Sequence, residues 1–170
     1  MAKSIPKYAA DKLPKDLLAA VGEVIVRWGR LEYQVHRLLC VGFEVPNEAG
    51  RALTIGMSIS SACATLRTLA AVDHWITDKK IRARIKDLQR DIQGEAERRH
   101  ELAHGVFGFD LDTPNDFARY TFRLPAHKVV PDSIPVDLND LHELAETARA
   151  LVERTIDLTV SVKAHHDSRK

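Results

Sequence analysis

Three stretches of this sequence carry apolar residues at every third or fourth position and a fourth does so less regularly, and this pattern constrains the fold more than any other feature. A three-four alternation lines one face of a helix with apolar side chains, and that face must be buried against other helices. The four seams are Leu17, Val21, Val24, Trp28, Leu31, Val35 and Leu38; Ala49, Leu53, Met57, Ala64, Leu66 and Leu69; Ile81, Ile85, Leu88, Ile92, Ala96, Arg99 and Ala103; and Leu141, Leu144, Ala148, Leu151, Thr155, Leu158 and Val162. The sequence therefore predicts an all-α fold, an antiparallel four-helix bundle.

Proline, glycine and small residues set the expected limits of the first two helices. Pro14 suits a first helical turn, and Gly42 can adopt the left-handed conformation that ends a helix, so the first helix is predicted between them. The second helix is predicted from about Asn47 to about Trp75. Its middle, residues 56–64, is rich in small residues that lower helix propensity, which makes this the weakest of the four helices.

The third helix is predicted to end at His104, because Gly105 follows directly. Its expected start lies at Thr77 and Asp78, which can cap the first turn with a side-chain oxygen. His104 then falls in the last turn, near the negative end of the helix dipole.

The seam pattern stops between the third and fourth long helices, where residues 105–136 are predicted to form a β-hairpin or long loop insertion. Two stretches of strand-like residues, 106–111 and 118–124, flank a turn-like segment at 112–116. Residues 125–135 contain three prolines and are predicted to be a loop. The whole chain, 1–170, is interpreted as one domain with a leader at 1–13 and a frayed tail at 164–170.

Composition narrows the functional classes. A formal net charge of +1 gives no general attraction to nucleic acid, so any such site must be a local patch. The basic stretch 79–99 is a candidate, although such a run is more often a solvated helix face. Cys40 and Cys63 fall inside apolar patterns and are predicted to be core thiols in a reducing compartment. No apolar signal core or run of about 20 apolar residues is found, which predicts a cytoplasmic location without a membrane segment.

The segment Arg99-His100-Glu101-Leu102-Ala103-His104 is the one chemically suggestive feature. Arg99 interrupts an apolar seam, and a permanently charged guanidinium is costly to bury without a partner. His100 and His104 are four residues apart and share a helix face, whereas Arg99 and His104 are about 140° apart. A histidine or arginine at a helix end usually caps backbone carbonyls or extends its charged group to solvent, and this explains each of the three residues singly. It explains less well why Arg99 occupies an apolar seam.

This segment resembles the R-x4-6-H motif of the HEPN superfamily (higher eukaryotes and prokaryotes nucleotide-binding), whose members are helical bundles. The glycine after His104 is also similar to the family pattern. In the first helix, Gly29-Arg30-Leu31-Glu32 resembles a glutamate-bearing turn of small bacterial HEPN-like proteins, and this makes Glu32 the expected counter-charge of Arg99.

The resemblance implies a metal-independent endoribonuclease that needs no cofactor and leaves a 2′,3′-cyclic phosphate and a 5′-hydroxyl. It implies that His104 is the general acid or base, that Arg99 stabilises charge on the phosphorane, and that His100 orients the phosphate or shares proton transfer. It further implies a homodimer, because one site needs both an acid and a base. RNA is then the substrate, in phage defence, a toxin–antitoxin pair or RNA processing.

Two other interpretations stay open. Glu97 with His100, and Glu101 with His104, both have the Glu-x-x-His spacing of di-metal carboxylate bundles, but here the two motifs lie in tandem on one helix instead of on two. The other alternative is a non-catalytic HEPN-like module that binds nucleotide or RNA, or that serves as an antitoxin-like or regulatory protein partner, since a fold does not establish an activity.

Overall fold

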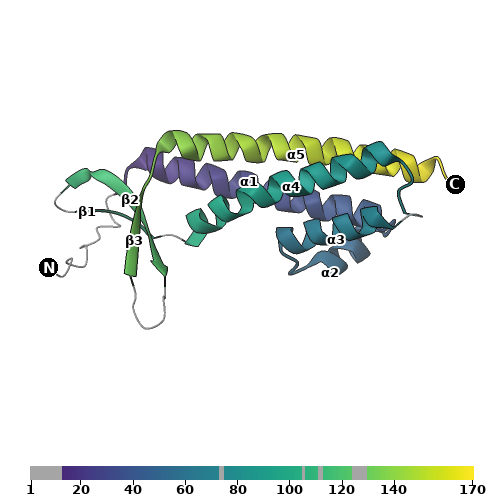
Figure 1. Cartoon of the computed structure of the whole chain (residues 1–170), viewed down its shortest axis with the longest axis horizontal. Coiled ribbons are helices and arrows are strands. Elements are labelled where there is room, and N and C mark those ends of the chain that lie inside the picture. Colours follow the sequence, from purple (N-terminus) through teal and green to yellow (C-terminus); the bar gives the residue numbers. More distant parts are fainter. Residues whose placement is uncertain (1–12, 73–74, 105, 111–112, 124–129) are drawn as a thin grey trace.

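The computed structural model describes residues 13–72, 75–104, 106–110, 113–123 and 130–170. Nearly all of the predicted leader, and Gly105 with its predicted helix-ending role, lie outside these residues. Helices form the body of the structure and contain the buried core, which confirms the predicted all-α class at that level (Figure 1). No helix among the described residues has the length and apolar character needed to cross a membrane.

The first helix, α1 (Lys15–Gly42), ends where the sequence predicts, but for a different reason. Gly42 is not left-handed; the residue with positive φ is Glu44, at 52°. A Cβ atom on Gly42 would overlap the ring of Trp75, whose Nε1 donates a hydrogen bond to the Gly42 carbonyl oxygen. Close approach of an indole, not backbone freedom, therefore accounts for this glycine.

The predicted second helix is two helices, so the single helix expected from 47 to 75 is wrong. α2 (Asn47–Thr54) and α3 (Ile59–Ala71) are separated by a turn in which Gly56 has φ of 76°, a value that favours glycine. Ser58 then begins α3 as its N-cap, and its side-chain oxygen accepts a hydrogen bond from the Ser61 amide at 3.2 Å. The small-residue segment thus contains a break and a new helix start.

Each of the two remaining long helices begins at an aspartate. α4 (Lys79–His104) follows Asp78, whose carboxylate accepts hydrogen bonds from the amides of Lys80 at 2.7 Å and Ile81 at 3.3 Å, as the sequence predicts. These two hydrogen bonds lower the pKa of Asp78. α5 (Leu138–Asp167) follows Asp137, which accepts from the amide of Asn139 at 2.8 Å.

The predicted frayed tail at 164–170 is wrong, because α5 stays helical through Asp167. His166 is buried, with 4% of its surface exposed. Beyond the helix, Arg169 donates a hydrogen bond to the carbonyl oxygen of Trp75 at 2.9 Å. Contacts with the segment between α3 and α4 therefore hold this end of the chain in place.

The long helices enclose one core. α1 and α5 lie side by side over much of their length, α3 packs on α1 and α4, and α4 crosses α5 (Figure 1). Every helix but α2 contributes residues to the core cluster, and the largest of its fully buried side chains are Trp28, Leu31, Leu38, Leu39, Ile76, Ile85, Ile92 and Leu158. Cys40 and Cys63 are buried free thiols, as predicted, and burial raises the pKa of Cys63 to about 12.

Three antiparallel strands lie between α4 and α5 in the order β1-β2-β3: β1 (Val106–Asp110), β2 (Thr113–Arg123) and β3 (Val130–Pro135). The predicted turn at 112–116 and the predicted loop over 130–135 are therefore wrong, because residues 113–116 start β2 and residues 130–135 form a strand. The prolines at 131 and 135 fit β3 because it is an edge strand, where a missing amide hydrogen need not cost a ladder bond. The sheet lies at the end of the helical body where α5 begins (Figure 1).

Candidate active site

The three polar residues of the motif lie in the last two turns of α4. α4 runs in the opposite direction to α1, so its C-terminal end lies alongside the first part of that helix (Figure 1). Because α4 is regular to His104, the side chains keep the angular order of an ideal helix. Arg99 is partly buried, whereas His100 and His104 are exposed.

Arg99 is directed toward α1, where it meets Glu32. Arg99 Nη2 lies 3.9 Å from Glu32 Oε1, and 26% and 35% of the two side chains are exposed. This separation is that of an ion pair rather than a direct hydrogen bond. The structure therefore brings together the two charges that the sequence pairs, and the arginine in the apolar seam has an acidic partner.

The guanidinium retains unused hydrogen-bonding capacity. Arg99 Nε is buried and has no hydrogen-bond partner among the described residues. A guanidinium carries five N–H donors, and a loose ion pair to one carboxylate oxygen occupies few of them. Arg99 is therefore loosely paired with Glu32, and its buried Nε has no partner among the described residues.

His100 and His104 form a tilted ring pair on the outside of the same helix end. Their ring centroids are 4.4 Å apart and the ring planes are tilted by 52°. Both imidazoles are reachable from solvent, as a group that exchanges protons with a substrate must be. Local loosening that would bring Arg99 and His104 together is not seen within α4, which stays helical through His104.

Two exposed arginines on α4 are paired with nearby carboxylates of the same helix. Arg90 lies 3.1 Å from Asp87 and 3.2 Å from Asp91, and Arg98 lies 3.0 Å from Glu95. Exposed pairs of this kind add little to stability, but they reduce the field that an RNA strand would meet. These pairs lie in the second half of the stretch 79–99, which is therefore not a continuous basic patch.

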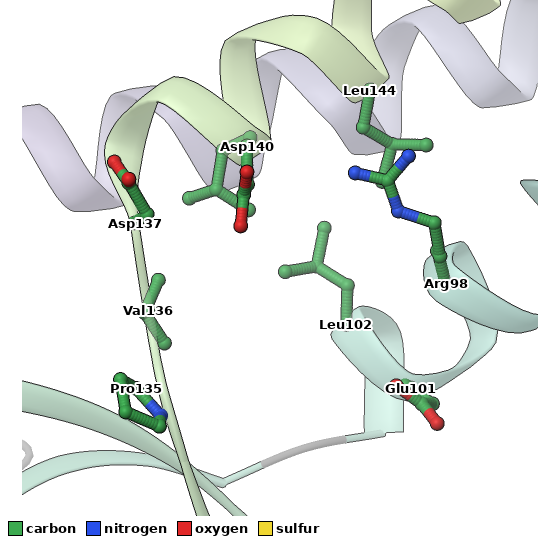
Figure 2. Close-up of a pocket in the computed structure, with 9 residues that line it drawn as sticks. Arg98, Glu101, Leu102, Pro135, Val136, Asp137, Asp140 and Leu144 are labelled. Carbon is green, nitrogen blue, oxygen red and sulfur yellow. The ribbon is translucent and has the colours of Figure 1, made fainter.

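A small cavity of about 140 Å³ lies on the inner side of the same helix end, and sequence reasoning did not identify it. Figure 2 shows Leu102 of α4 and Leu144 of α5 directed into it, with Arg98 on one side and Asp137 and Asp140 at the start of α5 on the other. Sites for small organic ligands measure about 300–1,000 Å³. This cavity is too small for a nucleotide, and neither histidine of the motif lines it.

The described residues contain no group of three or more histidine, cysteine, aspartate or glutamate side chains placed to hold a metal ion. The di-metal interpretation therefore has no ligand set in that part of the chain. No protein-family model, curated protein or solved structure matches the chain.

Proposed function

We propose that this protein is a HEPN-type endoribonuclease that cleaves RNA without a metal ion, at a site shared by two protomers. The observation that carries the proposal is the arrangement at the end of α4, where an arginine paired with Glu32 and two exposed histidines in contact with each other occupy the last two turns. In this proposal the long helices α1, α3, α4 and α5 are the four-helix bundle of that family, and β1–β3 are an insertion between its last two helices.

The reaction is transesterification at a phosphodiester. His104 takes the proton of the ribose 2′-hydroxyl, the 2′-oxygen forms a bond to phosphorus, and the bond from phosphorus to the 5′-oxygen breaks. A protonated imidazole, from His100 or from the partner protomer, gives its proton to the leaving 5′-oxygen. Arg99 donates hydrogen bonds to the phosphorane oxygens, and Glu32 positions Arg99.

An exposed face of α1 supports the homodimer. Leu18, Ile25 and Val26 are 54%, 37% and 72% exposed, and a Cβ atom added at Gly22 or Gly29 would meet nothing within 4 Å. This face, hereafter the α1 seam, has the four-three spacing of a helix-packing surface. Its glycines allow two helices to approach closely, and exposed apolar residues gain from being covered.

The order of residues in the α1 seam suits pairing with itself. Gly22 and Gly29 lie at equal distances from the midpoint between Ile25 and Val26, so two antiparallel copies of α1 place Gly22 of each opposite Gly29 of the other. Since α4 runs opposite to α1 and the Arg99 side chain reaches Glu32, the end of α4 that carries the histidines lies beside the part of α1 that precedes Glu32. A two-fold axis at the midpoint of the seam, between residues 25 and 26, would thus pass through the same stretch of α1 that the end of α4 approaches.

We expect Val26→Asp to convert the dimer to monomer and to reduce cleavage, because each protomer would then bury a carboxylate in an apolar interface. Val160→Asp on α5 is the matched control, since Val160 is 64% exposed on another helix. Sedimentation velocity at micromolar concentration measures the change. A wild-type protein that sediments as a monomer, or equal dissociation of both variants, would contradict the proposed interface.

The nature of the RNA ends tests the reaction itself. Purified protein incubated with an end-labelled single-stranded RNA is expected to cleave it in excess EDTA and to leave a 2′,3′-cyclic phosphate and a 5′-hydroxyl, because the nucleophile is the adjacent ribose oxygen. Mass spectrometry of the fragments distinguishes these ends. Fragments with 3′-hydroxyl and 5′-phosphate ends, or full loss of cleavage in EDTA, would overturn the proposed mechanism.

One observation favours a second candidate function, a non-catalytic HEPN-like module that binds RNA, nucleotide or an antitoxin-like or regulatory partner. The Arg99 guanidinium is directed to Glu32 on α1 and not to the histidines. In that case Arg99 is a structural residue, and the chain binds RNA without cleaving it. The end-group experiment separates the two functions, since only the nuclease produces fragments.

A further inference from the structure

A second cavity lies away from the motif, between α1 and the segment formed by α2 and the turn after it. Its volume is about 670 Å³, which falls within the range of about 300–1,000 Å³ for sites that hold small organic ligands. We call it the α1–α2 pocket. The residues that line it include Tyr33, His36, Arg37, Cys40, Arg51 and Ile55.

The α1–α2 pocket is cationic. Arg37 comes from α1 and Arg51 from α2, and no aspartate or glutamate lines the pocket. Neither guanidinium has a hydrogen bond or an ion pair to another side chain in the described part of the chain, in contrast to Arg90 and Arg98 on α4. Two uncompensated guanidinium groups lining one cavity favour an anion that can accept several hydrogen bonds, as phosphate does.

The pocket also offers a buried polar atom without a partner. His36 Nε2 is buried and makes no hydrogen bond to any described residue. Such an atom costs free energy unless a ligand or water pairs with it. His36 therefore adds a third hydrogen-bonding group to the two arginines.

The rest of the lining is apolar or aromatic. Ile55 is 84% exposed and Tyr33 is 51% exposed, whereas Cys40 is buried beneath them. An exposed isoleucine and a phenol ring provide surface that an apolar or flat ring can cover, and the tyrosine offers a stacking face. Cationic groups beside an aromatic face suit a ligand that has both a phosphate and a ring.

We propose that the α1–α2 pocket binds a phosphate ester that also carries an aromatic ring, with the phosphate held by Arg37 and Arg51 and the ring against Tyr33 and Ile55. Nothing in the motif of α4 takes part in this binding, so the inference stands apart from the proposed nuclease. The same chemistry has two sources, a free aryl phosphate or nucleotide, or one nucleotide of an RNA strand. The second source depends on the proposed function. His36 lies one turn beyond Glu32 on the same face of α1, so an RNA strand bound at the motif can extend to the pocket.

Calorimetric titration of the full chain with phenyl phosphate, inorganic phosphate and phenol tests the chemistry. Phenyl phosphate is expected to bind at least ten-fold more tightly than either of its parts, because it alone contacts both the arginines and the ring surface. Equal affinity for inorganic phosphate and phenyl phosphate, or no heat with any of the three, would overturn the proposal.

Variants locate the site. Arg37→Ala and Arg51→Ala are each expected to weaken phenyl phosphate binding about ten-fold or more, the usual range for loss of a hydrogen bond to a charged group. Both arginines are exposed, so neither substitution disturbs the core. Arg67→Ala, an exposed arginine on α3 that does not line the pocket, is the matched control. Unchanged affinity in both pocket variants, or equal loss in the control, would overturn the assignment.

Competition identifies the source of the phosphate. A single-stranded RNA that displaces phenyl phosphate more effectively than adenosine monophosphate does, at equal nucleotide concentration, assigns the pocket to an RNA strand. The reverse order assigns it to a free small molecule. Displacement by either competitor supports binding of a phosphate ester that carries a ring, whereas failure of both to compete would overturn the proposal. A separate measurement distinguishes this pocket from the proposed nuclease site: an Arg99 variant that loses RNA cleavage but still binds phenyl phosphate would show that the two sites are separate.

Discussion

If the protein is the proposed nuclease, replacing His104 with alanine is expected to lower the rate of RNA cleavage by about 10²–10⁴-fold, the range that general acid–base catalysis contributes. The proposed mechanism gives the proton transfer at the 2′-hydroxyl to this imidazole, and alanine cannot accept a proton. His104 is exposed in the last turn of α4, so its removal leaves the core intact. Single-turnover cleavage of a labelled RNA measures the rate, and circular dichroism verifies the helical content.

Matched variants on the same and on another helix show whether the loss is specific. His142→Ala removes an exposed imidazole from α5, 59% of whose side chain is accessible, and is expected to cleave at the wild-type rate. Arg99→Ala is expected to cost about 10²–10³-fold, as loss of a donor to a charged transition state does. Arg98→Ala, one residue away and already paired with Glu95, serves as its control. Wild-type rates for His104→Ala and Arg99→Ala would contradict the assigned roles.

Replacing Trp28 with alanine lowers the free energy of unfolding by about 3–5 kcal/mol, the usual cost of removing a large buried aromatic side chain. Trp28 is 1% exposed and belongs to the core cluster of the helical body. Its loss removes apolar burial and leaves a cavity that the surrounding helices cannot fill completely.

Denaturant unfolding followed by circular dichroism measures this loss, at one protein concentration for all variants because a dimer's stability depends on it. Val160→Ala on α5 is the reference, because Val160 is 64% exposed and a surface substitution is expected to change stability by less than about 0.5 kcal/mol. If Trp28→Ala lowers the free energy of unfolding by less than about 1 kcal/mol, the prediction is wrong, and the core does not need this side chain.

Local sequence patterns were sufficient wherever a single helix face or a single turn decides the structure. The three-four seams predict α1, α4 and α5, because burial of an apolar stripe depends only on spacing along one helix. Asp78 can be predicted as a cap because its side chain bonds to amides two and three residues further on. Glu32 and Arg99 were paired through the family resemblance, and packing places them 3.9 Å apart.

Other features could not be read from spacing, since the residues that cause them are distant in the sequence. The α1–α2 pocket was not predicted, because its two arginines come from different helices and become neighbours only when α2 folds back on α1. The third strand was interpreted as a loop because prolines disfavour strands in general, and only its place at the sheet edge makes them acceptable.

Spacing along the chain is enough to predict α1, α4 and the start of α5, their apolar faces and the motif at the end of α4, because each depends on residues within a few turns of one another. Packing between distant segments sets the need for Gly42 beside the Trp75 ring, the continuation of α5 to Asp167, and the direction of Arg99 toward Glu32 while the histidines face solvent. The physical reason is that these outcomes depend on which side chains from other segments occupy the space around a residue, and packing alone sets those neighbours.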